Sequence, residues 1–501
     1  MTQVIIIGAG LSGLSAGCYA QMNDYQSHIF EHHSQPGGVA ATWRRGEYLI
    51  DGGIHFVMSH KPGTALHKVY RQLGIVPACR FVDMTSYGRF IHESSGQSVV
   101  LTQDLDQIAA ALKSLSPADS HIVDELIAGA RGMQAQDMST VGFSKPPELT
   151  TRLDQLKEMW AIRRAARYFV GKYGQIVAEF LAESSDPVLR SCIENLFLPG
   201  VPVYFVLMIL ALLADGQMGL IEEGSHGFVR AIEDRYRNLG GTVTYQATVE
   251  QILVEADRAV GVRLADGTEH RADAVVSAAD GYSTIFKMLD RRYVDEKIVN
   301  RYATWKCFQP LLMISYGVAQ AFPDEPSFFT VMLEQPLTIG GRELPGFFGR
   351  FFNYGDSFAP PGKTVVQVEF ETEWDYWNDL QREDRARYEA EKDRLASEVL
   401  QRLEAHYPGI TSRVELIDVA TPYTTWRYTL NHRGSWGGWL MTPQTMTTMI
   451  RRTLPGLSNF YMAGQWVMPG GGVPPCLYSG RHAVQLLCRN DGKPFSVTEE
   501  S

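Results

Sequence analysis

Cysteines are few in this sequence, and none lies close to another. Only six occur among 501 residues, without a CxxC pair or the spacing of a metal site: Cys18, Cys79, Cys192, Cys307, Cys476 and Cys488. Scattered cysteines of this kind are typical of buried, reduced thiols in intracellular proteins. We therefore expect no metal site and no attachment of a cofactor through sulfur.

Positive charge is also scarce. The chain has 46 Lys and Arg residues against 56 Asp and Glu residues, which gives a net charge of −10. A nucleic-acid groove needs a basic surface, so we expect no nucleic-acid partner. A local basic patch at Arg163, Arg164 and Arg167 is compatible with this balance.

A secretory signal is missing as well, because the apolar run at 4–7 is too short and leads directly into glycines. We therefore expect a cytoplasmic protein. Hydrophobic residues make up 45% of the chain and charged residues 20%, as in folded proteins. At this length more than one domain is expected.

The stretch 195–214 has no charged side chain over 20 residues. A helix that crosses a bilayer needs about 20 apolar residues, but Pro199, Gly200 and Pro202 interrupt the first third. The remainder, Val203–Ala214, is predicted to form a short apolar helix. It would be a buried helix or channel wall; the alternatives are a helix face that dips into a membrane and a true span.

The segment 2–31 predicts a strand, a glycine turn, a helix and a second strand. The turn has the sequence GAGLSG, in which Gly8 permits a tight turn, Gly10 lets a pyrophosphate approach the backbone, and Gly13 lets the helix pack on the strand. The start of the helix adds free N–H groups. The expected dinucleotide contacts are Gly8, Gly10, Leu11, Ser12 and Gly13. A βαβ unit without a ligand is the alternative.

Glu31 ends the second strand, 18 residues after Gly13, where a carboxylate should accept hydrogen bonds from ribose hydroxyls. NAD and FAD both fit this much. Two further glycine segments, at 36–53 and 470–472, favour FAD, because its long diphosphate–ribityl chain needs a second anion site. A flexible loop is the alternative for the three glycines at 470–472.

The remaining pattern divides the chain into alternating pieces. Residues 242–264 look like successive strands of a meander, and a buried strand follows at 274–278. We predict an α/β fold. A Rossmann-like FAD-binding domain is assembled from the discontinuous segments 1–75, 222–290 and 450–490, with an inserted α+β substrate domain at 76–221 and 291–449 and a C-terminal tail at 491–501.

Four blocks of the chain, at 8–31, 36–55, 223–279 and 421–481, resemble the phytoene desaturase-related flavoproteins. These include carotenoid isomerases and retinol saturases and belong to the wider amine-oxidase-like FAD superfamily. The resemblance implies non-covalent FAD. The implied contacts are Gly8, Gly10 and Gly13 with the pyrophosphate, Glu31 with the ribose, Gly37 and Gly38 with the pyrophosphate and ribityl chain, Val249 with adenine, and Gly464, Gly472 and Val473 with the flavin.

Two positions depart from the family pattern. Gly464-Gln465 stands where many relatives have Gly-Asp, which weakens one ribityl or phosphate contact expected of Gln465. Gly224-Ser225 stands where relatives have Gly-Gly, which puts the local backbone in doubt.

Three side chains are candidates for the reaction. His55 follows a flavin-proximal segment and could act as an acid or base near neutral pH. Arg427 and His432 lie in a segment that resembles a substrate-side stretch of the family. The alternatives are a structural histidine for His55 and a solvated turn for the other two.

We therefore predict an FAD-dependent oxidoreductase that desaturates carbon–carbon bonds of a lipophilic polyene or isoprenoid. The alternatives are a saturase or a redox-neutral cis–trans isomerase using reduced FAD, an amine oxidase, and a non-catalytic lipid-binding escort protein. No second GxGxxG motif follows a strand, so oxygen, a quinone or a protein is the expected electron partner. Peripheral membrane contact is expected near Val203–Ala214.

Overall fold

The computed structural model describes residues 1–134, 137, 143–161, 163, 165–196 and 200–498. Arg164 of the expected basic patch lies outside these residues. So do residues 197–199 of the uncharged stretch.

A five-stranded parallel sheet forms the first half of the molecule, in the order β10-β2-β1-β14-β20. Its strands are β1 (Gln3–Ile7), β2 (Gln26–Phe30), β10 (Thr242–Thr244), β14 (Ala274–Ser277) and β20 (Phe460–Met462). Val4 to Ile7 of the central strand are all buried, which explains the continuous apolar run. The predicted α/β class and Rossmann-like sheet are confirmed.

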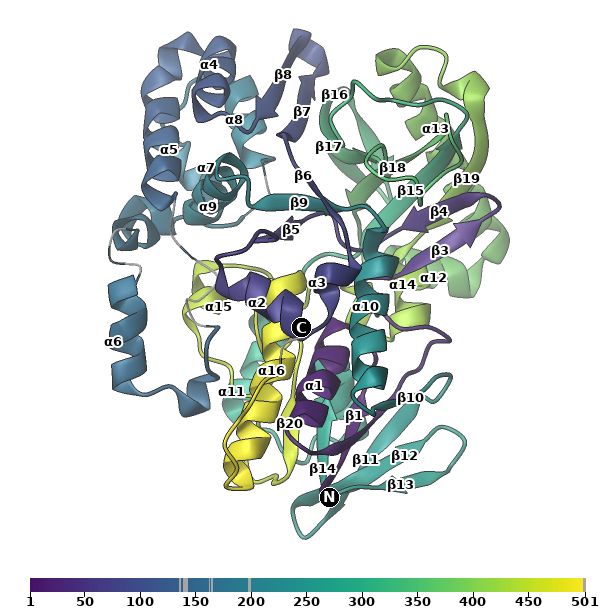
Figure 1. Ribbon diagram of the computed structural model, residues 1–501. Coiled ribbons are helices and arrows are strands. Elements are labelled where there is room, and N and C mark those ends of the chain that lie inside the picture. The colour runs from purple at the N-terminus through teal and green to yellow at the C-terminus, as the bar shows by residue number, and fades with distance from the viewer. Residues whose placement is uncertain (135–136, 138–142, 162, 164, 197–199, 499–501) are drawn as a thin grey trace.

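Three helices cover this sheet: α1 (Leu11–Met22), α10 (Gly224–Asn238) and α16 (Val473–Asn490). Figure 1 shows the N-terminal α1 lying beside the C-terminal α16. The contact is close, because a Cβ on Gly480 would lie 2.4 Å from the Ser12 carbonyl oxygen. Segments from opposite ends of the chain are thereby held against each other.

The predicted meander is present as β11 (Val249–Glu255), β12 (Arg258–Leu264) and β13 (Glu269–Arg271). The first of its expected strands was assigned wrongly. Residues 242–244 form β10, which pairs in parallel with β2 at the edge of the large sheet. The left-handed backbone of Gln246 (φ 54°) ends that strand before the meander begins.

A second, seven-stranded sheet has the order β19-β15-β18-β17-β16-β7-β8. Segment 76–221 contributes two of these strands and segment 291–449 contributes five: β7 (Ser86–His92), β8 (Gln97–Thr102), β15 (Leu311–Val318), β16 (Phe328–Ile339), β17 (Arg342–Phe351), β18 (Thr364–Glu371) and β19 (Val414–Ala420). The two segments meet where β7 pairs in parallel with β16. The domain boundaries themselves stay a prediction.

Helices α4 (Leu105–Leu115), α5 (Ser120–Met133), α8 (Pro187–Glu194) and α9 (Val203–Ala214) share one apolar core beside this sheet. None of the described helices is long and apolar enough to cross a membrane. The other longer elements are α2 (Ala65–Gln72), α6 (Arg152–Ala161), α11 (Glu296–Thr304), α12 (Trp374–Glu383), α13 (Arg385–His406), α14 (Pro422–Thr429), β3 (Thr42–Arg45), β4 (Tyr48–Asp51) and β9 (Met218–Ile221).

Candidate cofactor and substrate site

A cavity of about 1470 Å³ extends from the carboxyl end of the parallel sheet into the second half of the molecule. Ligands of open α/β sheets bind at this end of the strands. The cavity wall includes every predicted cofactor residue except Gly13: Gly8, Gly10, Leu11, Ser12, Glu31, Gly37, Gly38, Val249, Gly464, Gln465, Gly472 and Val473. The structure therefore brings these dispersed residues together.

The glycines of the first turn have different reasons to be glycine. A Cβ on Gly13 would lie 1.9 Å from the Gly8 carbonyl oxygen, so this residue lets the helix pack on the turn. Gly10 has an ordinary backbone (φ −72°), and its Cβ would lie 3.9 Å from the nearest described atoms. The fold does not require a glycine at 10, which is the position expected to face a pyrophosphate.

The second glycine segment lies directly against the first turn. The Gly37 N–H donates to the Ala9 carbonyl oxygen at 2.9 Å, and Gly10 and Gly37 form an isolated parallel bridge. Gly37 (φ 125°) and Gly38 (φ 59°) both adopt backbone conformations that favour glycine. One anion could therefore be contacted by both segments.

Glu31 closes the end of the cavity that the adenosine is expected to occupy. Its Oε2 accepts the Ala9 N–H at 2.5 Å and its Oε1 accepts the His33 N–H at 2.8 Å. The side chain is buried, and this burial raises the pKa of Glu31 despite the two backbone donors. Each oxygen keeps a lone pair for a ligand hydroxyl.

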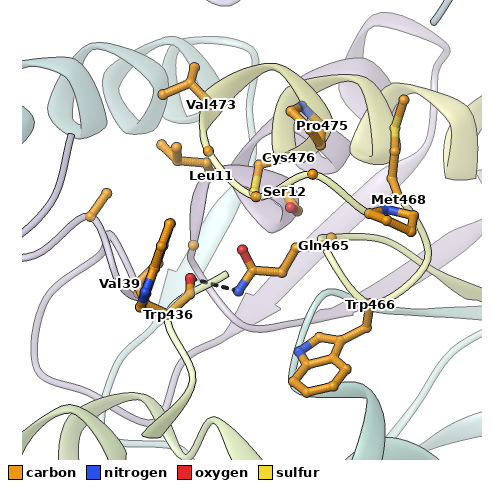
Figure 2. Close-up of a pocket in the computed structure, with 18 of the residues that line it drawn as sticks. Leu11, Ser12, Val39, Trp436, Gln465, Trp466, Met468, Val473, Pro475 and Cys476 are labelled. Atoms are coloured by element: carbon orange, nitrogen blue, oxygen red, sulfur yellow. Dashed lines mark hydrogen bonds between the residues drawn. The ribbon is translucent and has the colours of Figure 1, made fainter. Parts of the chain in front are cut away.

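The C-terminal segment forms the opposite wall, which Figure 2 shows. The Gly464 N–H donates to Ser479 Oγ at 2.7 Å, and Gln465 Nε2 donates to the Trp436 carbonyl oxygen at 2.9 Å. Gln465 thus fixes a neighbouring wall segment as well as lining the cavity. The Trp436 indole N–H is buried there without a partner among the described residues. A bound ligand would supply its acceptor.

The three glycines before α16 form a defined turn. Gly470, Gly471 and Gly472 all have positive φ (127°, 62° and 78°). No described atom lies within 4 Å of the position where a Gly472 Cβ would be. Pro474 and Pro475 lack N–H groups, so Gly472 and Val473 offer the backbone donors of this helix start. A close approach of ligand to backbone explains this arrangement.

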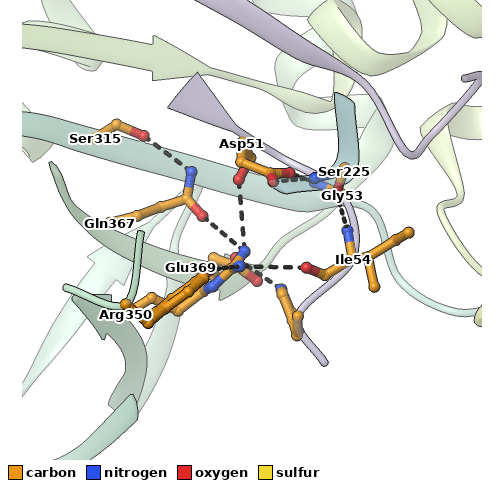
Figure 3. Close-up of polar contacts among 10 residues, drawn as sticks. Asp51, Gly53, Ile54, Ser225, Ser315, Arg350, Gln367 and Glu369 are labelled. Carbon is orange, nitrogen blue, oxygen red and sulfur yellow. Dashed lines mark hydrogen bonds and ion pairs between the residues drawn. The ribbon is translucent and has the colours of Figure 1, made fainter. Parts of the chain in front are cut away.

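The loop after β4 is held by Ser225, from the Gly224-Ser225 pair that departs from the family pattern, as Figure 3 shows. The Ser225 hydroxyl accepts the Ile54 N–H at 2.6 Å, and the Ser225 N–H donates to Asp51 Oδ2 at 2.7 Å. Asp51 Oδ1 accepts the Gly53 N–H at 2.9 Å. Gly224 retains the left-handed backbone (φ 68°). Ser225 therefore stabilises this loop.

His55 follows that loop and pairs with a carboxylate that sequence reasoning missed. His55 Nε2 lies 3.0 Å from Glu369 Oε1, and both residues line the cavity. Behind them, fully buried Arg350 has its Nη1 3.8 Å from the same oxygen and donates through Nη2 to the Ile54 carbonyl oxygen at 3.3 Å. Burial by itself would raise the pKa of Glu369, but the neighbouring His55 and Arg350 outweigh burial and hold this pKa below its ordinary value. The carboxyl therefore stays ionised.

Glu369 and Arg350 left one signal in the sequence. Each is a charged residue at a buried position of a strand otherwise rich in apolar and aromatic residues, β18 and β17. Buried charges in such strands have to be paired, and they are often functional. Their partner His55 lies about 300 residues away in the chain, so periodicity alone could not identify the pair.

The other two candidate side chains lie off the cavity wall. Arg427 is exposed, with its guanidinium over the Tyr428 ring at 5.5 Å. His432 stacks on Tyr282, with 4.2 Å between ring centroids. Burial, together with Arg433 and Lys287, lowers the pKa of His432 to about 4, so it is neutral near pH 7. The structure does not bring either residue together with His55.

The far half of the cavity is lined by apolar and aromatic side chains from α9 and β17. Tyr204, Met208 and Leu212 recur along α9 and face the cavity, whereas Phe347 and Phe348 come from β17. The rest of α9 is buried or nearly so in the helical core. The predicted channel wall is present, and no residue of α9 is exposed. The membrane contact expected near this helix stays a prediction.

Three glycine segments around one cavity, with an acidic residue after β2, are the features expected of an α/β protein that binds a dinucleotide. The chain matches the model of the flavin-containing amine oxidoreductases over residues 11–488. It belongs to this family, an enzyme family that uses a flavin. The predicted resemblance, enzyme class and flavin dependence are confirmed.

Among curated relatives, the chloroplastic prolycopene isomerase of Arabidopsis thaliana is 25% identical over 504 residues, spanning 95% of this chain and 81% of the relative. The lycopene-forming phytoene desaturase of Pseudescherichia vulneris is 22% identical, spanning 97% and 99%. An oxidoreductase from Methanosarcina mazei has a similar structure, with a TM-score of 0.60, 17% identity and coverage of 96% and 100%. Cyclohexylamine oxidase from Brevibacterium oxydans has a TM-score of 0.60 and is 14% identical, with coverage of 98% of this chain and 100% of that protein.

Proposed function

We propose that this protein is an FAD-dependent desaturase of a long, apolar polyene or isoprenoid. The observation that carries the proposal is the cavity, which joins a glycine-lined end to apolar walls and has an ionisable pair, His55 and Glu369, in its lining. Burial of each CH₂ group contributes about 0.8 kcal/mol, so such a substrate can bind without many polar anchors. The curated desaturases and isomerases among the relatives support this substrate class.

The cofactor is proposed to be FAD, bound without a covalent bond in a domain formed by 1–75, 222–290 and 450–490. Gly10 and Gly472 leave open the space that a pyrophosphate and a flavin would fill. Cys476 lines the cavity, but burial raises the pKa of its thiol to about 11, so it is not a reactive thiolate. The substrate domain, at 76–221 and 291–449, supplies the apolar walls.

His55 is proposed to exchange a proton with the substrate. Ionised Glu369 can only accept a hydrogen bond, so His55 donates from Nε2 and keeps Nδ1 as an acceptor. When bound, the flavin supplies a hydride acceptor for cleavage of a C–H bond. His55 Nδ1 then accepts the proton from the neighbouring carbon, and Glu369 stabilises the resulting imidazolium.

An isomerase, or a saturase working in the opposite direction, is the second candidate. The same histidine can donate a proton to a polyene and take one back, which leaves the substrate at its original oxidation level. Curated prolycopene isomerases among the relatives support this reading. Amine oxidases share the fold alone at 13–14% identity, so they give the amine-oxidase alternative no further support.

The remaining partners are also proposals. We expect electrons to pass to oxygen, a quinone or a protein rather than to NAD(P)H, since the sequence offers no second dinucleotide motif. A cytoplasmic enzyme in peripheral contact with a membrane is supported by six free cysteines and by the apolar cavity.

The test is an anaerobic panel of carotenoid precursors, retinoids, unsaturated fatty acids and small amines. Each is mixed with oxidised and with photoreduced enzyme, and flavin absorbance and extracted products are followed. Bleaching of oxidised flavin by a polyene, with a new double bond in the product, supports desaturation. Turnover by reduced enzyme alone favours the saturase or isomerase. Turnover of amines, with silence toward every polyene, overturns the proposal.

A further inference from the structure

We infer that the outer face of α6 (Arg152–Ala161) docks on an anionic bilayer and that substrate enters the cavity beside it. This inference rests on the proposed function in one respect, because it requires a lipophilic substrate. It moves the membrane contact from α9, which is buried, to a helix at the outer edge of the molecule in Figure 1.

The outer face of α6 is apolar and exposed. Leu153, Leu156, Met159 and Trp160 are 69%, 60%, 65% and 68% exposed, and no residue of this fully described helix is buried. Leu153, Leu156 and Trp160 lie at i, i+3 and i+7, so they share one side. Apolar side chains gathered in this way mark an interaction surface, whereas single exposed ones are ordinary.

The opposite face of α6 is polar and faces the cavity. Gln155 and Glu158 line the cavity wall. Glu158 accepts the Ser144 hydroxyl at 2.8 Å, and Asp154 accepts Lys145 Nζ at 2.9 Å. These contacts fix the rotation of the helix. The apolar side chains therefore point away from the protein on a helix whose other face lines the cavity.

The charge around this face selects an anionic partner. The chain as a whole is acidic, yet residues 152–172 include six basic and two acidic residues. Both acids, Asp154 and Glu158, are engaged with Lys145 and Ser144 on the inner face. Basic residues near an apolar face, with tryptophan among them, are typical of helices that lie in the headgroup region of a bilayer.

Three of the cations stand beside the apolar side chains. Arg152 and Lys157 are exposed on α6 itself, and the Arg163 guanidinium stacks over the Trp160 ring at 3.9 Å. A second copy of the chain is a poorer occupant, because a twofold contact would place these cations opposite their own copies. A bilayer with anionic headgroups matches both the charge and the apolar side chains.

Two further exposed apolar side chains line the cavity. Met446 and Met449 are 37% and 66% exposed, and both line the same cavity as Gln155 and Glu158. A substrate leaving the acyl region beside α6 would therefore meet apolar side chains on its way in. Such a molecule would not have to cross water as a free solute.

Vesicle cosedimentation tests the surface without any turnover. The holoenzyme is mixed with phosphatidylglycerol-containing and with pure phosphatidylcholine vesicles. We expect wild type to bind the anionic vesicles, with weaker binding at high salt. The Leu156→Glu/Trp160→Glu variant should bind at least tenfold more weakly. Ile417→Glu, at a 45% exposed apolar position on β19, is the matched control and should bind like wild type.

Three results would overturn the docking surface. The first is equal vesicle binding by wild type and Leu156→Glu/Trp160→Glu. The second is equal loss of binding in Ile417→Glu. The third is a wild-type dimer that this double variant converts to a monomer while vesicle binding stays unchanged, because the face would then join two copies of the chain. Arg152→Gln/Lys157→Gln should weaken binding to anionic vesicles selectively.

Substrate delivery separates this inference from the proposed function. A polyene is offered either within anionic vesicles or dispersed in detergent. The Leu156→Glu/Trp160→Glu variant should lose most turnover of the vesicle-borne substrate and keep that of the dispersed substrate and its flavin content. Equal turnover by both routes contradicts the entry path. Absence of turnover by wild type under both conditions contradicts the proposed function, while the vesicle-binding result stands by itself.

Discussion

The two ends of the cavity are built in different ways. The cofactor end consists mainly of glycine backbone from three segments, and the space beside Gly10 and Gly472 is open to the cavity. The substrate end consists of side chains from a helix and a sheet whose contacts join residues far apart in the chain. Backbone binds a phosphate chain of fixed shape, whereas side chains can be varied to fit different substrates. The first end is therefore expected to define the family and the second the substrate.

Replacing Gly10 with valine should give the largest effect and tests whether the cofactor end is separable from the fold. The backbone at this position suits any residue, and the new side chain would enter the cavity rather than the protein. We expect purified Gly10→Val to hold at most a tenth of the wild-type flavin, with unchanged circular dichroism. Gly13→Ala is the control for fold damage, because its Cβ overlaps the Gly8 carbonyl. Full flavin content in Gly10→Val contradicts the cofactor site.

His55→Gln should have the next largest effect. It tests whether the His55 side chain, which lines the cavity, takes part in the reaction. Glutamine can still donate to Glu369 but cannot accept the proton. We expect kcat to fall about 100-fold, as is usual for loss of a general acid–base group, with flavin content and melting temperature unchanged. Exposed His121→Gln is the matched control. A rate within twofold of wild type would reduce His55 to a structural residue.

Leu212→Trp sharpens the comparison at the substrate end. Leu212 lies on the cavity wall, and a larger ring there shortens the space available to a long chain. Overpacking of this kind costs about 1–3 kcal/mol, so kcat/KM for a long polyene should fall about tenfold. A shorter substrate and the flavin content should be little affected. Leu212→Met, of similar volume, is the control, and equal losses for long and short substrates would argue against a length-selective wall.

The smallest expected effect is a fall in folding stability at acid pH, caused by a buried histidine on α16. His482 on α16 accepts from Arg452 Nη2 at Nδ1 (3.1 Å) and donates from Nε2 to the Phe143 carbonyl oxygen at 2.7 Å. Burial, with Arg452, lowers its pKa to about 3. The unfolded chain binds a proton below its ordinary pKa of about 6.5, and the folded chain does not. Stability should therefore fall as pH drops from about 6.5 toward 3, by about 1.4 kcal/mol per unit.

Urea unfolding between pH 7 and pH 4.5 measures this slope, with His482→Gln as the comparison. Glutamine can keep both hydrogen bonds and does not titrate. The wild-type free energy of unfolding should decline more steeply than that of the variant. Parallel curves would show that His482 does not contribute to the acid dependence.

The sequence predicted the cofactor end of the cavity much better than the substrate end. Glycine turns are local, and Gly8 to Glu31 form within one βαβ unit, so their spacing predicts their structure. The assignment of 242–244 to the meander was wrong, because the choice between two sheets depends on the free edge of β2 rather than on propensity. Glu369 and Arg350 were missed because their contacts with the 51–55 loop join distant parts of the chain. Arg427 and His432 were chosen by resemblance, and tertiary packing turns them away from the cavity.

The position of β20 and α16 has a consequence for how the protein matures. These elements and the loop between them supply Gly464, Gly472 and Val473, and they follow β1 by about 450 residues of chain. During synthesis the first glycine turn is made early, but the wall opposite it is absent until these elements have emerged. A growing chain cannot enclose a flavin before then, so we expect cofactor loading only after residues 460–490 have emerged. An unloaded chain would expose its apolar cavity, and we expect the supply of flavin at that moment to influence how much active enzyme accumulates.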